Sequence, residues 1–183
     1  STTADDFTTS NAQYAENNYN TVDTAGARAA LRINLGENWT VTPQVMYQAS
    51  SGQGSWGDDL NDVLASGKYA VSHFRKEFSD DEWWQAGATI EGNVNGFDVV
   101  YSGNYLSRHQ EGSFDYSDYS YYYDNLYTSG YFAHLFFDNQ GNQLNPDAAF
   151  SNEDEYTKAS HEIRVSTPQD KRVRGLLGFF YQK

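Results

Sequence analysis

Tyrosine and aspartate are concentrated in one stretch of this chain, DYSDYSYYYD at residues 115–124. A tyrosine ring offers a flat apolar face and a polar hydroxyl, which suits stacking on a sugar or on the ring of another ligand. The sequence therefore predicts six stacking candidates: Trp56, Tyr116, Tyr119, Tyr121, Tyr122 and Tyr123. The same rings could instead pack their loops against neighbouring loops.

Acidic side chains surround these tyrosines. Residues 109–156 contain nine Asp and Glu and no Lys or Arg. Carboxylate oxygens are the ligands that Ca²⁺ prefers, so Asp115, Asp118 and Asp124 form a candidate weak calcium site. The alternative is a solvated acidic loop. The nearby segment DNQGN at residues 138–142 lacks the full spacing of a calcium loop and is typical of a turn.

Arginine supplies the third set of chemically useful groups. Arg108 is a candidate for binding an anionic ligand, because a guanidinium recognises carboxylates and phosphates. Further charges alternate along predicted strands: Arg28, Arg32, Glu91, Asp98, Glu162, Arg164, Arg172 and Arg174. Pairing among these charges, which would brace the protein, is the interpretation that the sequence favours.

Catalytic patterns are missing from the sequence. The four histidines are scattered, His161-Glu162 lacks the second histidine of H-E-x-x-H, and no G-x-S-x-G or phosphate loop occurs. Cysteine is absent, which excludes disulfides and thiolate metal sites. The net charge of −13 argues against nucleic acid as a partner. We therefore expect no enzyme and no resident cofactor apart from the candidate Ca²⁺.

The elements that must position these residues alternate with a period of two, as strands do. Six strands are predicted, at residues 23–35, 39–48, 83–91, 97–108, 157–166 and 172–182. Short turns join them in three hairpins, whereas long loops cover residues 49–81 and 109–156. Residues 1–20 read as loop, and residues 59–67 could hold a short helical turn.

All six strands place their apolar residues on one face. On that face His161 is the only ionisable side chain, and the charges listed above fall on the other. A slip of one residue would exchange the faces, so the agreement is informative. Aromatic residues near the strand ends, such as Trp39, Trp84 and Tyr181, flank an aliphatic band.

This pattern predicts an all-β fold, an antiparallel transmembrane β-barrel segment with long extracellular loops. No run of about 20 apolar residues provides a transmembrane helix. The alternative is a soluble or surface-attached β-sandwich that binds carbohydrate, with acidic, Ca²⁺-binding loops. A structural subunit of a larger assembly is a third reading.

The residues also resemble a known family. The segments SHEIRVSTP and RVRGLLGFFYQ, GARAALRINLGENWTVTPQVMYQ, EWWQAGATIEG, FDVVYSGNYLSR and DYSDYSYYYD look like strands and loops of TonB-dependent outer-membrane receptors. The similarity covers residues 21–182. The plug and TonB-box patterns of that family are absent, so the resemblance implies that residues 1–183 are part of a larger, 22-stranded barrel.

The resemblance further implies a function. Such receptors take up a scarce nutrient across the outer membrane of a Gram-negative bacterium, and a ferric siderophore is the cargo that the resemblance favours. Cobalamin or an oligosaccharide stays open. The implied partners are outer-membrane lipid and lipopolysaccharide, the plug domain with the remaining barrel strands, and the TonB complex.

Overall fold

The computed structural model describes residues 2–4, 7–55, 57, 59–128 and 136–183. The chain divides into two compact units. The first, called the loop unit, comprises Ser1–Asp23, Ser51–Asp80 and Glu111–Glu153. The second, called the sheet unit, comprises Thr24–Ser50, Asp81–Gln110 and Asp154–Lys183.

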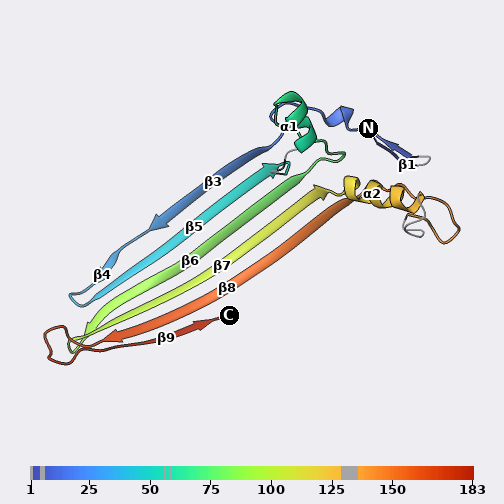
Figure 1. Cartoon of the computed structure of the whole chain (residues 1–183). Coiled ribbons are helices and arrows are strands. Elements are labelled where there is room, and N and C mark those ends of the chain that lie inside the picture. Colours follow the sequence, from blue (N-terminus) through green and yellow to red (C-terminus); the bar gives the residue numbers. More distant parts are fainter. Residues whose placement is uncertain (1, 5–6, 56, 58, 129–135) are drawn as a thin grey trace. The chain divides into compact units, whose positions relative to one another are not determined.

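The main sheet is antiparallel and has seven strands, whose order in space follows the chain (Figure 1). The strands are β3 (Thr21–Ala30), β4 (Ile33–Leu35), β5 (Trp39–Gln53), β6 (Phe78–Val94), β7 (Phe97–Asp115), β8 (Ala149–Ser166) and β9 (Leu176–Gln182). β3 and β9 are the two edges, and β4 pairs with β5 beside β3. The three predicted hairpins are therefore confirmed, with the first strand divided in two.

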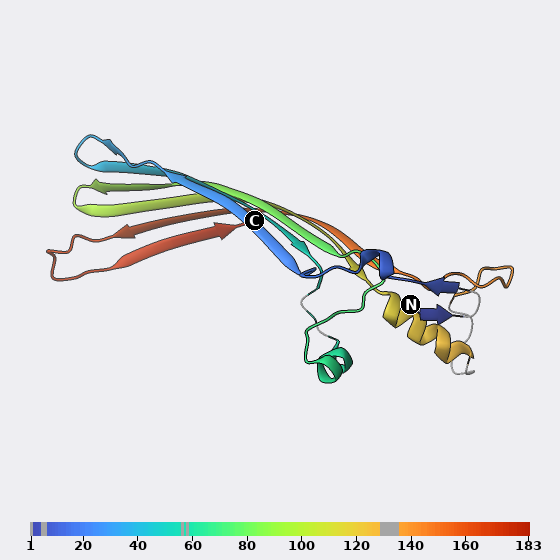
Figure 2. The same ribbon diagram turned by 90° about the horizontal axis from the view of Figure 1, so that it is seen from above.

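In each hairpin of the sheet unit a turn joins the two strands, and these turns lie at the same end of the unit (Figure 2). Asn95 and Gly96 join β6 to β7 with φ of 52° and 87°. Positive φ at both central residues is the requirement of a type I′ turn, whose twist matches that of the strands. Gly36, with φ of 69°, begins the turn between β4 and β5.

The pairing register confirms the two faces. In β8 and β9 the directly opposed pairs include Ile163 with Phe179 and Val165 with Leu177, and the alternate pairs include Arg164 with Gly178. Opposed residues of an antiparallel pair point to the same face, so Ile163, Val165, Leu177 and Phe179 lie together, whereas Phe180 and Leu176 share the other face with Glu162 and Ser166. β4 and β5 behave alike, because Leu35 faces Trp39 on the apolar side.

Pro43 explains why the first predicted strand is interrupted. The Leu31 amide donates to the Pro43 carbonyl over 3.1 Å, but Pro43 has no N–H to return the bond. The ladder is therefore incomplete beside Leu31 and Arg32, which fall between β3 and β4. The prediction of Arg32 as a strand residue was wrong for this reason.

The last strand begins later than predicted, at Leu176 instead of residue 172. The Thr167 amide donates to Gly175 O (3.0 Å), and the Gly175 amide donates to Thr167 Oγ1 (2.9 Å), which closes a loop over the residues between them. Arg172 and Arg174 lie in this loop, so they are not charges on a strand face.

The other strands are longer than predicted at their loop ends. β6, β7 and β8 contain 17, 19 and 18 residues. Their extra residues, such as His109, Glu111, Glu153 and Glu155, are polar on both faces, so no apolar alternation marks them as strand. The irregular loops are correspondingly shorter than 49–81 and 109–156.

The loop unit contains more regular structure than the sequence indicates. α1 (Leu60–Ser66) confirms the short helical turn, and Gly67 follows it with φ of 68°. The prediction of loop was wrong for two segments. β1 (Thr2–Ala4) and β2 (Phe7–Thr9) form a hairpin followed by the 3₁₀ turn η1 (Ala12–Tyr14), and α2 (Ser117–Thr128) is a helix.

Burial is confined to the loop unit. The buried described residues are Phe74, Glu77, Gly112, Ser117, Ser120, Tyr121, Asp124 and Pro146, and none of the described residues of the sheet unit is buried. The core of the loop unit is thus largely polar, and its stability depends on hydrogen bonds between its segments.

Candidate functional site

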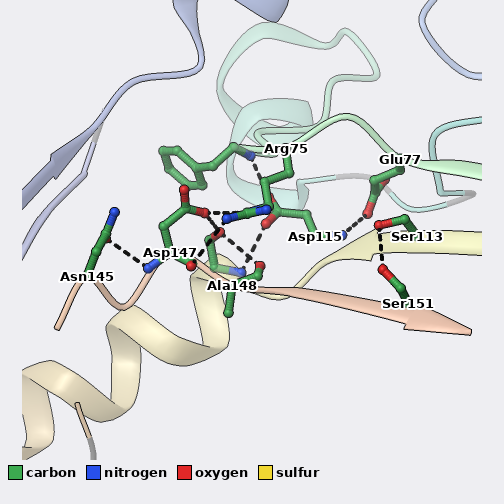
Figure 3. A network of polar contacts seen from close by, with 10 residues as sticks. Arg75, Glu77, Ser113, Asp115, Asn145, Asp147, Ala148 and Ser151 are labelled. Carbon is green, nitrogen blue, oxygen red and sulfur yellow. Dashed lines mark hydrogen bonds and ion pairs between the residues drawn. The ribbon is translucent and has the colours of Figure 1, made fainter. Parts of the chain in front are cut away.

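Glu77, at the last position before β6, ties together the segments of the loop unit (Figure 3). Its side chain is 2% exposed. Oε1 accepts the Asp115 amide over 2.9 Å, and Oε2 accepts the Ser55 amide over 3.0 Å. A buried carboxylate needs such donors, because an unpaired buried charge is costly.

Two further groups complete the surroundings of Glu77. His73 Nδ1 lies 2.7 Å from Oε2, close enough for an ion pair although the angle does not fit a hydrogen bond. The backbone amide of Glu77 donates to the Tyr19 hydroxyl over 2.9 Å, and its carbonyl accepts from Gly54 over 3.1 Å. One residue therefore holds four segments that are distant in sequence.

Arg75 makes the second connection, to the segment before β8. Its Nε donates to Asp147 Oδ1 over 2.7 Å, and Ser117 Oγ donates to the same oxygen over 2.7 Å (Figure 3). Burial alone would raise the pKa of Asp147, but the hydrogen bonds from Arg75 and Ser117 and the guanidinium charge lower it below its usual value.

α2 is fixed by a polar buried stripe. Its buried residues are Ser117, Ser120, Tyr121 and Asp124, with the spacing of one helix face. Asp115 Oδ1 accepts the Ser117 amide over 3.0 Å at the start of the helix, and Asp118 lies in its first turn, where the helix dipole favours acids. Because three of the four buried residues are polar, hydrophobic periodicity could not predict this helix.

The predicted stacking tyrosines separate into two groups. Tyr121 is 3% exposed and packs on Phe74 at 6.3 Å between ring centroids, so it belongs to the core and offers no face to a ligand. Trp56 lies outside the described residues. The other tyrosines form a chain of rings on α2, with Tyr116–Tyr119 at 4.7 Å and Tyr119–Tyr123 at 4.4 Å.

This tyrosine chain is accessible. Tyr116, Tyr119 and Tyr122 are 46%, 50% and 59% exposed. The hydrogen bond with Tyr123 raises the pKa of Tyr119 to about 12, with desolvation and the neighbouring Tyr123 and Tyr116 adding to it. The Tyr119 ring is thus neutral, and the contacts between neighbouring rings preorganise the chain of tyrosines.

The candidate calcium residues do not converge. Among the described residues there is no group of three or more His, Asp or Glu side chains that could hold a metal ion. Asp115 accepts the amides of Phe74 and Ser117, and Asp124 accepts from Gln143 at 3.3 and 3.4 Å. Burial, repulsion from Asp115 and, less strongly, from Asp59 raise the pKa of Asp118 against the opposing effect of His73.

The charges of the sheet unit pair with each other. Arg108 donates to both carboxylate oxygens of Asp81, at 2.7 and 2.9 Å, and Arg164 does the same to Glu162, at 2.6 and 2.9 Å. Arg28 bonds Gln44 at 3.3 Å, and Asp98 accepts from Asn93 at 2.8 Å. Glu91 lies on β6. These contacts agree with bracing and leave Arg108 with its guanidinium engaged.

The loop unit contains a groove that the sequence patterns do not predict. It has a volume of about 670 Å³ and is lined by parts of residues 11–20 and 66–75, including Tyr14, Tyr19, Tyr69, Lys68 and Arg75. The available signal was charge, since residues 68–76 contain three Lys and Arg in an otherwise acidic region. The groove's lining comes from two segments whose proximity the sequence does not reveal.

Comparisons with protein-family models, with curated proteins and with solved structures found no match. In the part of the chain that the structure describes, no helix is long and apolar enough to cross a membrane.

Proposed function

We propose that this chain forms part of the barrel wall and outer loops of a TonB-dependent outer-membrane receptor. The observation that carries the proposal is the apolar face of the sheet unit. On β8 and β9 that face presents Ile163, Leu177, Phe179 and Tyr181, which are 43%, 78%, 67% and 51% exposed. Such a surface needs a cover, and lipid covers the outer face of a transmembrane barrel.

The opposite face supports the same proposal. It carries the paired charges Arg108 with Asp81 and Arg164 with Glu162, whose exposure to water suits a polar lumen. The sheet is open, because β3 and β9 pair with no further strand in the described chain. Unpaired edges are costly in lipid, so we propose that further strands complete the barrel.

The loop unit then faces the cell exterior and the turns near Gly36, Gly96 and Pro168 face the periplasm. The loop unit captures the ligand, and the completed barrel, with its plug and the TonB complex, transports it. A ferric siderophore is the cargo that the family resemblance favours. No covalent step is proposed.

Labelling of intact cells tests this arrangement. A membrane-impermeant amine reagent is expected to modify the exposed Lys68 and Lys76 in the loop unit and to leave Lys171, in the turn before β9, unmodified. After cell lysis all three lysines should react, which controls for reactivity. Lys171 has a 66% exposed side chain, so protection in intact cells would report its compartment.

Cell fractionation gives a second test. The proposal requires that the protein is recovered with the outer membranes and needs detergent to be extracted from them. Recovery of the protein in the aqueous phase would contradict it and would favour the soluble carbohydrate-binding sandwich.

A further inference from the structure

The groove of the loop unit has the size and composition of a ligand site. Its volume of about 670 Å³ falls within the range of about 300–1,000 Å³ of small-molecule pockets. Three tyrosines, Tyr14, Tyr19 and Tyr69, line it together with asparagines between residues 11 and 20. Rings give apolar stacking surfaces, and amides give donors and acceptors for hydroxyl groups.

The Lys and Arg residues of the loop unit lie at this groove or beside it. The unit contains 16 Asp and Glu but three Lys and Arg, namely Lys68, Arg75 and Lys76. Lys68 and Arg75 line the groove, and Lys76 lies 5.9 Å from the centre of the Tyr14 ring, which also lines it. His73 lines the groove as well, and Glu16 is the single acidic residue among the lining residues. An anion would therefore meet attraction here and repulsion over most of the remaining unit.

The basic side chains at the groove differ in whether a carboxylate already binds them. Arg75 is paired with Asp147 and His73 with Glu77, so both have a carboxylate partner. No ion pair of Lys68 or Lys76 occurs among the described residues. A ligand would therefore compete with no carboxylate for Lys68 or for Lys76, whose ammonium group lies over the Tyr14 ring, whereas Arg75 and His73 shape the wall.

The three tyrosine rings of the groove also differ in how accessible they are to a ligand. The Tyr19 hydroxyl is occupied by the Glu77 amide at 2.9 Å, which holds that ring in place. Tyr69 is 83% exposed, so its ring is accessible, whereas Tyr14 is 37% exposed and has the Lys76 ammonium group over its ring. A rigid wall beside an accessible ring is suited to a ligand whose own ring can stack.

We propose that this groove binds an organic anion that carries a ring with an apolar face, with its charge held by Lys68 and Lys76 and its ring stacked on Tyr69. The biological role as cargo capture rests on the function proposed above, but the binding itself does not. Two sources share this chemistry: an oligosaccharide with uronic acid units, and a ferric chelate built on aromatic acids.

Binding to the purified full chain in detergent, measured by isothermal titration calorimetry, tests the proposal. The probes are trigalacturonate, its neutral methyl ester, and the ferric complex of 2,3-dihydroxybenzoate. We expect an anionic probe to bind, the affinity to fall at high salt, and the ester to bind at least about tenfold more weakly than the acid. Which anionic probe binds identifies the source.

Variants locate the site. Lys68→Gln should weaken binding by about fivefold to tenfold, since it removes a charge-assisted contact, and Tyr69→Ala should weaken it by about fivefold. Glu16→Gln should strengthen it, since it removes the opposing charge. Lys171→Gln and Tyr156→Ala are matched controls, because both residues are exposed and lie outside the groove.

The proposal is overturned if neither anionic probe binds, if the ester binds as well as the acid, or if Lys68→Gln behaves as Lys171→Gln does. The labelling experiment on intact cells separates this failure from a failure of the receptor proposal. Lys68 accessible on cells that bind no anionic probe would leave the receptor standing and remove only the ligand class.

Discussion

The loop unit and the sheet unit distribute their charge and their burial in opposite ways. The loop unit has three basic and 16 acidic residues, hence a net charge of −13, whereas the sheet unit has nine of each and is neutral. All buried described residues belong to the loop unit, and four of these eight have polar or charged side chains, namely Glu77, Ser117, Ser120 and Asp124.

The difference agrees with the two kinds of surroundings, lipid and water, that we propose for the two units. A neutral sheet with charge pairs on one face and aliphatic side chains on the other is suited to an apolar medium on one side. A strongly charged unit held by buried hydrogen bonds is suited to water, in which its excess charge is solvated. The predictions below test whether the two units depend on different interactions.

The largest effect is expected on the apolar face of the sheet unit. Ile163→Arg should lower the free energy of unfolding in lipid vesicles by about 2–4 kcal/mol if the residue lies near the bilayer centre. Ser160→Arg, on the opposite face of the same strand, should cost less than about 1 kcal/mol. Urea titration followed by tryptophan fluorescence measures both. Equal costs would contradict the assignment of the apolar face to lipid.

Loss of Glu77 is expected to affect only the loop unit. Glu77→Ala leaves the Ser55 and Asp115 amides without their acceptor and removes the carboxylate next to His73, a cost of about 3 kcal/mol. Hydrogen exchange should accelerate at residues 54–55 and 115–117 and stay unchanged in β9. The exposed Glu153→Ala is the control. Protection at residue 115 equal to that of the parent protein would refute this role of Glu77.

Two glycines with similar backbones offer a finer comparison. Gly54 in the loop unit and Gly36 in the sheet unit have φ of 78° and 69°. Gly36→Ala should cost about 1 kcal/mol of backbone strain, because open space surrounds its Cβ position. Gly54→Ala should cost about 2 kcal/mol or more, because its Cβ would collide with Asn20 Oδ1. Urea midpoints give the difference, and equal costs would show that Asn20 moves freely.

The smallest expected effect is a loss of stability of the loop unit at acid pH. The lowered pKa of Asp147 means that its contacts with Arg75 and Ser117 stabilise the loop unit fully above about pH 4, the ordinary value for Asp, and less as the pH falls through the lowered value. Exposure of Arg75 limits this contribution to less than about 1 kcal/mol. NMR titration should show the pKa of Asp147 rising in Arg75→Gln, and an unchanged pKa would contradict the assignment.

Strand pairing and the two faces were predictable, because side-chain alternation is a local property of extended backbone. The register of Ile163 with Phe179 agrees with the alternation read from the residues. The turn at Asn95-Gly96 was predictable for the same local reason. Proline lacks the N–H of a ladder hydrogen bond, so Pro43 signals a break from sequence alone, but its effect on Leu31 and Arg32 depended on which residue lay opposite.

α2 and the groove were not predictable from local patterns. The buried stripe of α2 contains Ser117, Ser120 and Asp124, so burial and hydrophobicity disagree there. Their burial is stabilised by partners such as Asp147 and Gln143, which lie far along the chain. Periodicity methods assume that buried residues are apolar, and this core is not.

The sequence by itself determined which residues of each strand share a face, since a period of two needs only neighbours along the chain. It also determined that most of the acidic excess falls outside the parts of the strands that alternate between apolar and polar residues. Tertiary structure alone decided that Glu77 joins Ser55, His73 and Asp115, and that Lys68 and Arg75 line one groove with Tyr14 and Tyr19. The physical reason is that polar loops are positioned by long-range hydrogen bonds, whose partners no local pattern specifies.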